Sequence, residues 1–432
     1  MNYGKRIYKL IQLLWPLNRS LTGNDNRKTL KLLKNINPKL KIKEVKSGTK
    51  VFDWKIPNEW NVSDAYIKDL VSNKKIIDFK NNNLHLMGYS IPVKKKLNYI
   101  QLIKKLNYLK TNPKAIPYTT SYYKKDWGFN LAYNKFKSIK KNHNFKVEIK
   151  SSLKKGSMTY GELFFKGISK KEFIFSTYIC HPSMANNELS GPALSIFLTK
   201  IFKKKKNYFS YRFLFIPETI GSISYISKNY LKIKKNVVGI VNLTCVGDNK
   251  TTSFLTTKYG NTFLDDLCIK LLRSKKIKFK KYNWNERGSD ERQYMSALVN
   301  VPTISIMSSK FHTYKEYHTS KDNLKFINSK GLNKNYHIYK SLIEKLDQIK
   351  FPLSKIICEP NLSKRNLYPS KSIFYKKDNK KKSKDLLTFL SFCDGTNTLE
   401  NISRYSKLDI NYIKNIYKQL LKLNLIKENT NA

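Results

Sequence analysis

The sequence has few acidic residues and few arginines, although its total charge is very large. It contains 84 Lys and Arg against 30 Asp and Glu, which gives a formal net charge of +54. Only nine of the basic residues are Arg, and the lysines are spread along the whole chain. A dedicated nucleic-acid site concentrates its basic residues and uses Arg for specific contacts. The charge therefore predicts weak attraction to polyanions rather than a protein specialised for nucleic acid.

Several other features are absent, and each absence excludes a class of protein. No window of about 18 apolar residues exists, so we expect no membrane-spanning helix. Residues 1–20 lack the apolar stretch and cleavage site of a secretory signal, which favours a cytoplasmic location. The five Cys are widely spaced without a Cys-x-x-Cys pair, as is typical of reduced thiols. No glycine-rich phosphate loop is found, and Ser190 and the Cys lack a His partner in sequence context, which argues against serine or thiol hydrolysis.

The most informative stretch joins an apolar run to a histidine and a carboxylate. Residues 173–179 are apolar and β-branched and predict a buried strand that ends just before His181. Glu188 follows in a polar loop, directly before an apolar helix predicted to begin near Ser190. A His at a strand end with a carboxylate in the next loop is a common way to build a metal site.

Three later strands repeat this pattern. Residues 211–217 are followed by Glu218, residues 237–246 by Asp248, and residues 301–307 by a loop that carries His318. Ligands of open α/β sheets bind at the carboxyl ends of the strands. We therefore expect one sheet edge to gather a set of metal-ligating and acidic side chains: His181, Glu188, Glu218, Asp248, Asp290, Glu291 and His318.

The order of these motifs resembles the bacterial zinc aminopeptidase superfamily, and most closely the aminopeptidase-like proteins found among surface-polysaccharide genes. The resemblance covers essentially the whole chain. It is carried by these segments: Leu14–Gly23, Cys180–Ser183, Asn187–Gly191, Pro217–Ser222, Gly288–Tyr294 and Tyr317–Asp322. It implies an exopeptidase-like α/β core with a mainly parallel sheet, a small inserted domain and a C-terminal winged helix.

The resemblance also implies roles for individual residues. His181, Glu218 and His318 match zinc ligands of the family, and Glu188 is a further candidate ligand. Such a zinc activates a water molecule, and a nearby carboxylate moves the proton of that water. Glu218 is a candidate for that catalytic role as well; if it is a ligand, the base is Asp290 or Glu291.

Three positions depart from the two-metal pattern of the family. Asn187 stands where an Asp bridges the metals, Thr244 where an Asp is a ligand, and Pro217 where a Glu is the base. These departures favour one zinc ion over two. They also leave open a non-catalytic relative that keeps the fold and the metal.

Two residues near the site carry open interpretations. Asp322 is either a partner that orients His318 or an acidic residue of a surface loop. His312 could join the metal site, but a single His in a loop is more commonly a residue without a role in metal binding.

The domain boundaries are expected as follows. Residues 1–45 and 146–352 form the aminopeptidase-like α/β core, and 46–145 form a small β-rich insertion. Its clustered aromatics, Tyr118 to Phe129, are expected to form its own core, although the insertion could also roof the metal site. Residues 353–384 are a linker with a strand near 372–375, and 385–432 form the winged helix.

The winged helix admits two functions. Lys414, Lys418 and Lys422 lie on one predicted helix and could face DNA. We favour a protein partner, because that face has no cluster of Arg, Gln or Ser suited to base edges.

The leading hypothesis is a zinc-dependent amide or peptide hydrolase of aminopeptidase type, acting on a small peptide or an amide-bearing sugar intermediate. Only the resemblance links it to surface polysaccharide biosynthesis. The alternatives are a non-catalytic zinc-binding or assembly protein with the same fold, and a regulator that binds nucleic acid through its winged helix.

Overall fold

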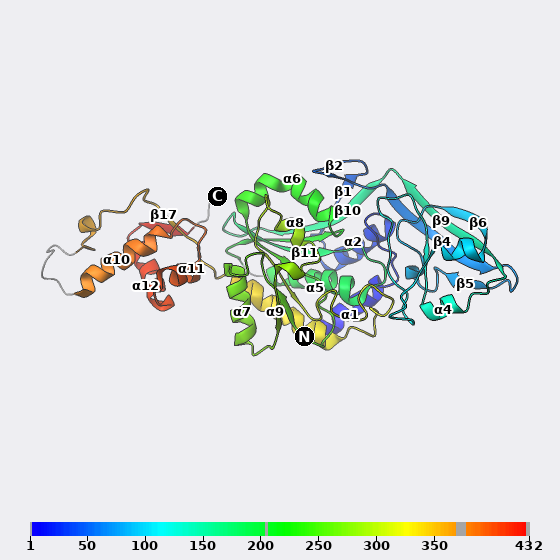
Figure 1. Ribbon diagram of the computed structural model, residues 1–432. Helices are drawn as coiled ribbons and strands as arrows, with labels where there is room; N and C mark the ends of the chain where they lie inside the picture. The colour runs from blue at the N-terminus through cyan, green and yellow to red at the C-terminus, as the bar shows by residue number, and fades with distance from the viewer. Residues whose placement is uncertain (1, 204–205, 369–376, 429–432) are drawn as a thin grey trace. The chain divides into compact units, whose positions relative to one another are not determined.

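The computed structural model describes residues 2–203, 206–368 and 377–428 (Figure 1). The chain divides into two compact units. The larger comprises Met1–Phe165, Glu172–Lys206 and Tyr211–Ser341, and the smaller comprises Lys166–Lys171, Asn207–Ser210 and Leu342–Ala432. Among the described residues, no helix is long and apolar enough to cross a membrane.

An eight-stranded mixed sheet is the framework of the larger unit. Its order is β1-β10-β12-β11-β13-β16-β14-β15. The pairs β11–β13, β13–β16 and β14–β15 are parallel, whereas β1–β10, β10–β12 and β14–β16 are antiparallel. The strands span Lys41–Lys46 (β1), Ser157–Phe165 (β10), Ser210–Ile216 (β12), Glu172–Tyr178 (β11), Val237–Asn242 (β13), Thr303–Met307 (β16), Ser253–Leu255 (β14) and Lys280–Tyr282 (β15).

All four strands expected from the apolar runs are present, as β11, β12, β13 and β16. Every residue of β11, β12 and β16 is buried. Central strands covered on both faces need apolar side chains on both, which explains runs without alternation. Figure 1 shows α6 on one face of this sheet and α1 with α5 on the other.

The helices of this region follow the expected alternation with strands. Their bounds are Tyr3–Leu14 (α1), Asn24–Ile36 (α2), Ser190–Leu198 (α5), Ile220–Asn236 (α6), Phe263–Ser274 (α7), Glu291–Tyr294 (α8) and Ser329–Leu346 (α9). A π-helical turn, η2 (Ala185–Leu189), leads directly into α5. Such turns are rare in proteins, and those that occur are often found at functional sites.

A second, antiparallel sheet accounts for the β-rich character of the segment expected as an insertion. Its order is β5-β4-β9-β6, with bounds Lys75–Asp78 (β5), Glu59–Asp69 (β4), Asn144–Lys154 (β9) and Val93–Asn98 (β6). β9 continues past residue 145 because it pairs along its length with β4. The exact boundaries of an inserted domain stay a prediction. Short elements complete this region: Lys50–Val51 (β2), Trp54–Lys55 (β3), Tyr99–Ile103 (α3), Leu106–Asn107 (β7), Phe129–Asn130 (β8) and Tyr133–Lys137 (α4).

The smaller unit has the elements expected of a winged helix. Helices Lys377–Ser391 (α10), Leu399–Ser406 (α11) and Ile410–Lys422 (α12) surround an apolar core, and Asp409 caps α12 through the N–H groups of Asn411 and Tyr412. β17 (Pro352–Ser354) pairs antiparallel with β18 (Ile426–Glu428). The strand expected near 372–375 lies outside the described residues.

Candidate functional site

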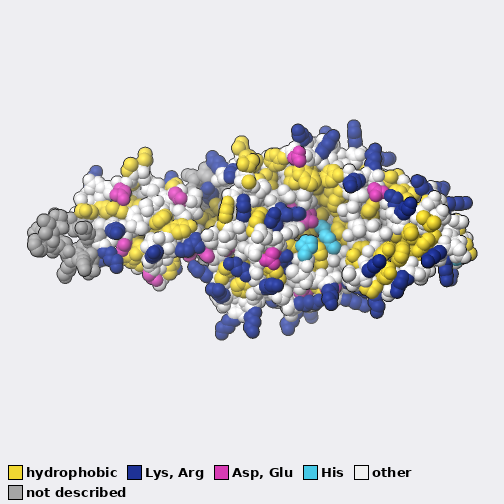
Figure 2. Space-filling model, viewed as in Figure 1, with side chains coloured by type: hydrophobic (Ala, Val, Ile, Leu, Met, Phe, Trp, Pro, Cys, Tyr) yellow, Lys and Arg dark blue, Asp and Glu magenta, His cyan; other side chains and the backbone are white. Residues whose placement is uncertain are grey.

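A pocket of about 510 Å³ opens at the carboxyl end of β11 in the larger unit. His181 lies three residues beyond that strand, and Glu218 two residues beyond β12. Figure 2 shows histidine side chains gathered at one place on the surface, with acidic and basic side chains close by. The residues that line the pocket are Leu21, Trp54, Tyr118, Thr119, Thr120, Tyr122, Tyr123, Cys180, His181, Glu218, Thr219, Ile220, Arg292 and His318.

Three of the four expected metal ligands face one another in this pocket. Nε2 of His181 lies 3.8 Å from Oε2 of Glu218. The ring centres of His181 and His318 are 5.3 Å apart. The structure therefore brings together His181, Glu218 and His318, which come from three separate loops that follow β11, β12 and β16.

His318 has a free nitrogen in the pocket. Its backbone is left-handed, with φ +52°, and its carbonyl accepts the N–H of Tyr118 at 2.9 Å. Nε2 of His318 is buried and has no hydrogen-bond partner among the described residues. Burial and the neighbouring His181 lower the pKa of His318 to about 2, so its imidazole is neutral with a lone pair available.

These donors fit a zinc ion. Zinc takes neutral imidazole nitrogens and carboxylate oxygens, and a buried imidazole nitrogen without a partner is otherwise unfavourable. Burial raises the pKa of Glu218, while His181 opposes that change by favouring the carboxylate. A cation between the three groups would satisfy both the free nitrogen and the buried acid.

Glu188 lies on the opposite side of the His181 ring from Glu218. Its Oε1 accepts a hydrogen bond from Nε of Arg19 at 2.5 Å. Its Oε2 accepts a hydrogen bond from the backbone N–H of His181 and lies 3.2 Å from Nδ1 of the same residue. Both carboxylate oxygens therefore already have partners. This geometry suits a residue that orients His181, since ligating histidines commonly bond a carboxylate through their second nitrogen.

A second possible set of metal ligands consists of Cys180, His181 and Glu188. Cys180, His181 and Glu188 offer ligand atoms that lie within 4.8 Å of one another. However, burial raises the pKa of the Cys180 thiol well above its usual value, and its sulfur accepts the N–H of Glu218 at 3.2 Å. Cys180 could therefore bind zinc only after losing this proton, because the thiolate is the form that ligates the metal.

The two candidate bases, Asp290 and Glu291, differ in how their oxygens are used. Glu291 is held by the N–H groups of Gly288 and Ser289 and by the amide of Asn242. Oδ1 of Asp290 accepts the N–H of Thr219 at 2.7 Å and the hydroxyl of Ser222 at 2.8 Å, while Oδ2 has no partner among the described residues. Burial and the charge of Glu218 raise the pKa of Asp290 to about 7.

Asp322 does not orient His318. Its carboxylate accepts the backbone N–H groups of Asn186 at 2.7 Å and Asn187 at 2.9 Å, together with the hydroxyl of Tyr314 at 3.0 Å. The side chain is buried, so it is not a surface acid either. Asp322 instead satisfies the free N–H groups at the start of η2.

The remaining residues singled out from the sequence have structural partners. Asp248 accepts hydrogen bonds from Asn186 and Ser309. The hydroxyl of Tyr178 lies within hydrogen-bond distance of both Asn187 and Thr244, and the hydroxyl of Thr244 also donates to the carbonyl of Asn187 at 3.1 Å. Two of the three positions that depart from the family pattern therefore bond each other directly and through Tyr178. His312 is exposed and does not line the pocket.

Three site residues had no role assigned from the sequence: Arg19, Tyr118 and Arg292. Arg19 is wholly buried against Glu188. The ring of Tyr118 lies 5.1 Å from that of His181 and 5.2 Å from that of His318. The aromatics of the expected insertion therefore divide: Trp127 and Phe129 are core residues, while Tyr118 and its neighbours line the pocket. Arg19 and Arg292 lie within segments that carry the family resemblance, and this position is the sequence signal that could have identified them.

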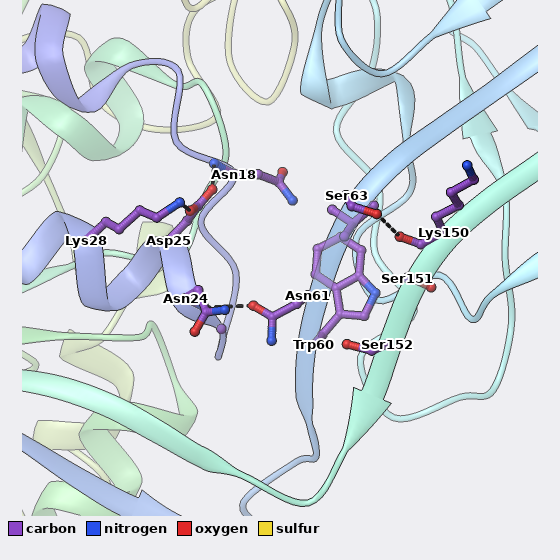
Figure 3. Close-up of a pocket in the computed structure, with 12 residues that line it drawn as sticks. Asn18, Asn24, Asp25, Lys28, Trp60, Asn61, Ser63, Lys150, Ser151 and Ser152 are labelled. Atoms are coloured by element: carbon purple, nitrogen blue, oxygen red, sulfur yellow. Dashed lines mark hydrogen bonds and ion pairs between the residues drawn. The ribbon is translucent and has the colours of Figure 1, made fainter.

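A second pocket, of about 460 Å³, lies between the start of α2 and strands β4 and β9 (Figure 3). Asn24 donates its N–H to Asn61 at 2.8 Å, and Asp25 pairs with Lys28 at 2.9 Å. The described residues that line it include neither His nor Cys, which are the imidazole and thiol donors of the first pocket.

Comparison with known proteins places the chain in a family. A family model described as Domain of unknown function (DUF4910) matches residues 8–349, and a winged helix-turn-helix model matches residues 352–428. A Clostridium acetobutylicum protein provisionally named a polysaccharide biosynthesis protein with aminopeptidase-like domain is 41% identical over 425 residues, covering 98% of this chain and 96% of the relative.

Solved structures agree on the fold. A crystal structure from Clostridium acetobutylicum, provisionally titled a peptidase, is 40% identical with a TM-score of 0.79, covering 98% of this chain and 96% of that chain. A zinc aminopeptidase from Bacillus subtilis is 12% identical with a TM-score of 0.59, covering 79% of this chain and 95% of that chain, and this likeness concerns the fold alone. The expected α/β fold is confirmed, with a central sheet that is mixed rather than mainly parallel. The chain belongs to the DUF4910 family of aminopeptidase-like proteins with a C-terminal winged helix.

Proposed function

We propose that the protein is a zinc-dependent amide hydrolase that holds one ion through His181, Glu218 and His318. The observation that carries the proposal is the buried Nε2 of His318, which has no hydrogen-bond partner among the described residues and lies near His181 and Glu218 in an open pocket. A bound zinc at this position would supply an activated water and polarise the substrate carbonyl.

The surrounding residues prepare these groups for the task. Glu188 accepts from the backbone of His181 and lies beside its Nδ1, so it fixes the ring with Nε2 toward the pocket. Tyr118 packs against both histidine rings and lines the same pocket. These contacts restrict the rotamers of the ligands before any ion binds, which is the preorganisation that metal sites need.

Asp290 is the better of the two candidate bases. Asp290 is buried behind the residues that line the pocket, where the charge of Glu218 influences it. Its Oδ2 has no partner among the described residues, whereas Glu291 accepts hydrogen bonds from three donors. In hydrolysis, the water oxygen forms a bond to the amide carbon, the carbon–nitrogen bond breaks, and the proton from water passes through the base to the leaving amine.

The link with polysaccharide biosynthesis is part of the proposal and rests on the name of the Clostridium acetobutylicum relative. The substrate proposed is a small peptide or an amide-bearing sugar intermediate, acted on in the cytoplasm. A non-catalytic binding protein is the second candidate, and it is favoured by Asn187 and Thr244, which replace acidic positions of two-metal enzymes with neutral groups hydrogen-bonded to Tyr178.

The test is elemental analysis of purified full-length protein that has been stripped with a chelator and dialysed against zinc. The unsubstituted protein should retain one zinc, and H181A/H318A should retain none. H312A is the matched control, because His312 is exposed and outside the pocket, and it should retain the ion. C180A distinguishes the two donor groups: loss of zinc in C180A with retention in H318A would contradict the proposed ligand set.

Catalysis needs a separate readout. The zinc-loaded protein should hydrolyse members of a broad panel of amides, and the activity should disappear in H181A/H318A. A protein that holds zinc but is inert across the panel would favour the binding protein.

A further inference from the structure

Arg292 presents a fixed cationic group to the pocket. It belongs to the short helix α8, and its Nε donates to the carbonyl of Ser289 at 2.9 Å. Its Nη2 donates to Oγ1 of Thr219 at 3.3 Å. No ion pair joins Arg292 to a carboxylate within the part of the chain that the structure describes. The guanidinium is therefore anchored at two points and keeps donors for a ligand.

Thr219 ties this cation to the metal-binding residues. It follows Glu218 directly and has φ +63°, which is strained for a β-branched residue. Asp290 accepts the Thr219 N–H and so supports this conformation. Strain maintained by surrounding contacts is typical of functional sites. The guanidinium of Arg292 therefore bonds the residue that directly follows the proposed zinc ligand Glu218.

The pocket offers no second acid for a positively charged substrate end. Glu218 is the only acidic side chain among the described residues that line it. If Glu218 binds the ion, none of the described lining residues offers a second carboxylate to a free amino group, because Asp290 and Glu291 do not line the pocket. An ammonium group would instead meet Arg292, and like charges at close range repel.

The lining of the pocket also contains several aromatic side chains. Trp54, Tyr118, Tyr122 and Tyr123 line it together. The hydroxyls of Tyr118 and Tyr122 lie 2.6 Å apart, and the rings of Trp54 and Tyr123 meet edge to face at 5.7 Å. These side chains present ring faces suited to packing against a flat or ring-shaped group.

We propose that this site selects a small amide that carries a carboxylate, which Arg292 binds while the aromatic side chains of the lining pack against the rest of the molecule. The inference rests on the proposed hydrolase function and names its substrate class: acidic amides without a required free amino terminus. Two sources share this chemistry, an N-acylated amino acid and an N-acylated acidic sugar. The products of hydrolysis are a carboxylic acid and an amine, one of which retains the carboxylate that Arg292 bound.

The large positive charge of the chain attracts any anion, so the test must separate that background from Arg292. Arg287 is the matched control. It is also exposed, it contacts Trp284 through its Nη1 and over the ring, and it does not line the pocket. R287Q and R292Q remove the same charge within five residues of each other.

The experiment is calorimetric binding to zinc-loaded full-length protein, with two matched pairs of probes. N-acetylphenylalanine is compared with N-acetylphenylalaninamide, and N-acetylmuramic acid with its neutral carboxamide, N-acetylmuramamide. In at least one pair we expect the acid to bind about tenfold or more tightly than its neutral partner, a preference lost in R292Q and kept in R287Q. The pair that shows it identifies the amino-acid or the sugar source.

The controls keep the two proposals distinct. R292K retains the charge without the fork of donors and should keep part of the preference, and zinc content must be unchanged in each Arg292 variant. Equal binding of acids and neutral amides, or equal losses in R287Q and R292Q, would overturn the role of Arg292 even if amides are hydrolysed. An Arg292-dependent preference in a protein that hydrolyses nothing would support acid recognition and overturn the hydrolase function alone.

Discussion

Nε of Arg19 lies 2.5 Å from Oε1 of Glu188, and both side chains are wholly buried. Arg19 also donates to the carbonyl of Leu14 at 2.6 Å, at the end of α1. Glu188 in turn contacts the backbone and ring of His181. This pair therefore connects the N-terminal helix to the first proposed zinc ligand.

Breaking this pair should destabilise the protein strongly. A buried ion pair that loses one partner leaves a charge without compensation, which costs roughly 3–5 kcal/mol. We expect R19M and E188Q each to lose about that much free energy of unfolding. The double variant R19M/E188Q should lose clearly less than the sum of the two. Urea denaturation of all four proteins measures this coupling, and additive losses would show that the two side chains act independently.

Replacing Asp290 should separate catalysis from metal binding. D290N keeps the shape of the side chain and removes the proton acceptor, so kcat should fall about 100-fold or more while zinc content stays unchanged. E291Q should mainly lower stability, because Glu291 accepts the N–H groups of Gly288 and Ser289. Full activity in D290N would remove Asp290 as the base.

The Arg27–Glu59 pair predicts a specific loss of stability in acid. Nη1 and Nη2 of Arg27 contact the two oxygens of Glu59 at 2.7 Å and 2.6 Å, joining α2 to β4. The hydrogen bonds from Arg27 lower the pKa of Glu59 from 4.5 to about 2. Because the pKa is lower in the folded state, the carboxylate contributes stability above pH 4.5 and loses it as the pH falls toward about 2.

E59Q should therefore be less stable at pH 7, by about 1 kcal/mol given the partial exposure of the pair. Its stability should also fall less steeply between pH 4.5 and 2. Chemical denaturation across this range measures both effects. E316Q is the comparison, because Glu316 pairs with the more exposed Lys250. A parallel acid response in E59Q and the unsubstituted protein would contradict the prediction.

The exposed lysines of α12 test whether the winged helix binds DNA. Lys414, Lys418 and Lys422 are exposed at four-residue spacing, and Lys94, Lys95 and Lys96 are exposed together on β6. If DNA binding is only a consequence of net charge, replacing either set by Gln should weaken it equally. Fluorescence anisotropy at several salt concentrations decides this. A much larger loss of DNA affinity in the α12 variant than in the β6 variant, together with a weaker dependence of its remaining affinity on salt, would support a DNA-binding winged helix.

The sequence by itself determined the elements and most of the proposed ligand set. Apolar runs predicted β11, β12, β13 and β16, because strands buried on both faces carry little else. Polar residues just after such strands must gather at the sheet's carboxyl edge, so the proximity of His181 and Glu218 followed from local pattern. The sequence alone also showed that Asn187 stands where the resembled two-metal enzymes have a bridging Asp.

Only the tertiary structure decided what each polar group bonds. Glu188 and Glu218 look alike in the sequence, yet Arg19 occupies one while the other faces the pocket. Asp322 was expected to orient His318 or to lie on the surface, but it caps η2 instead. Tyr118 reaches the histidines because a loop near the second sheet bonds to the backbone of His318. Such pairings depend on contacts between segments distant in the chain, and hydrophobic periodicity carries no information about them.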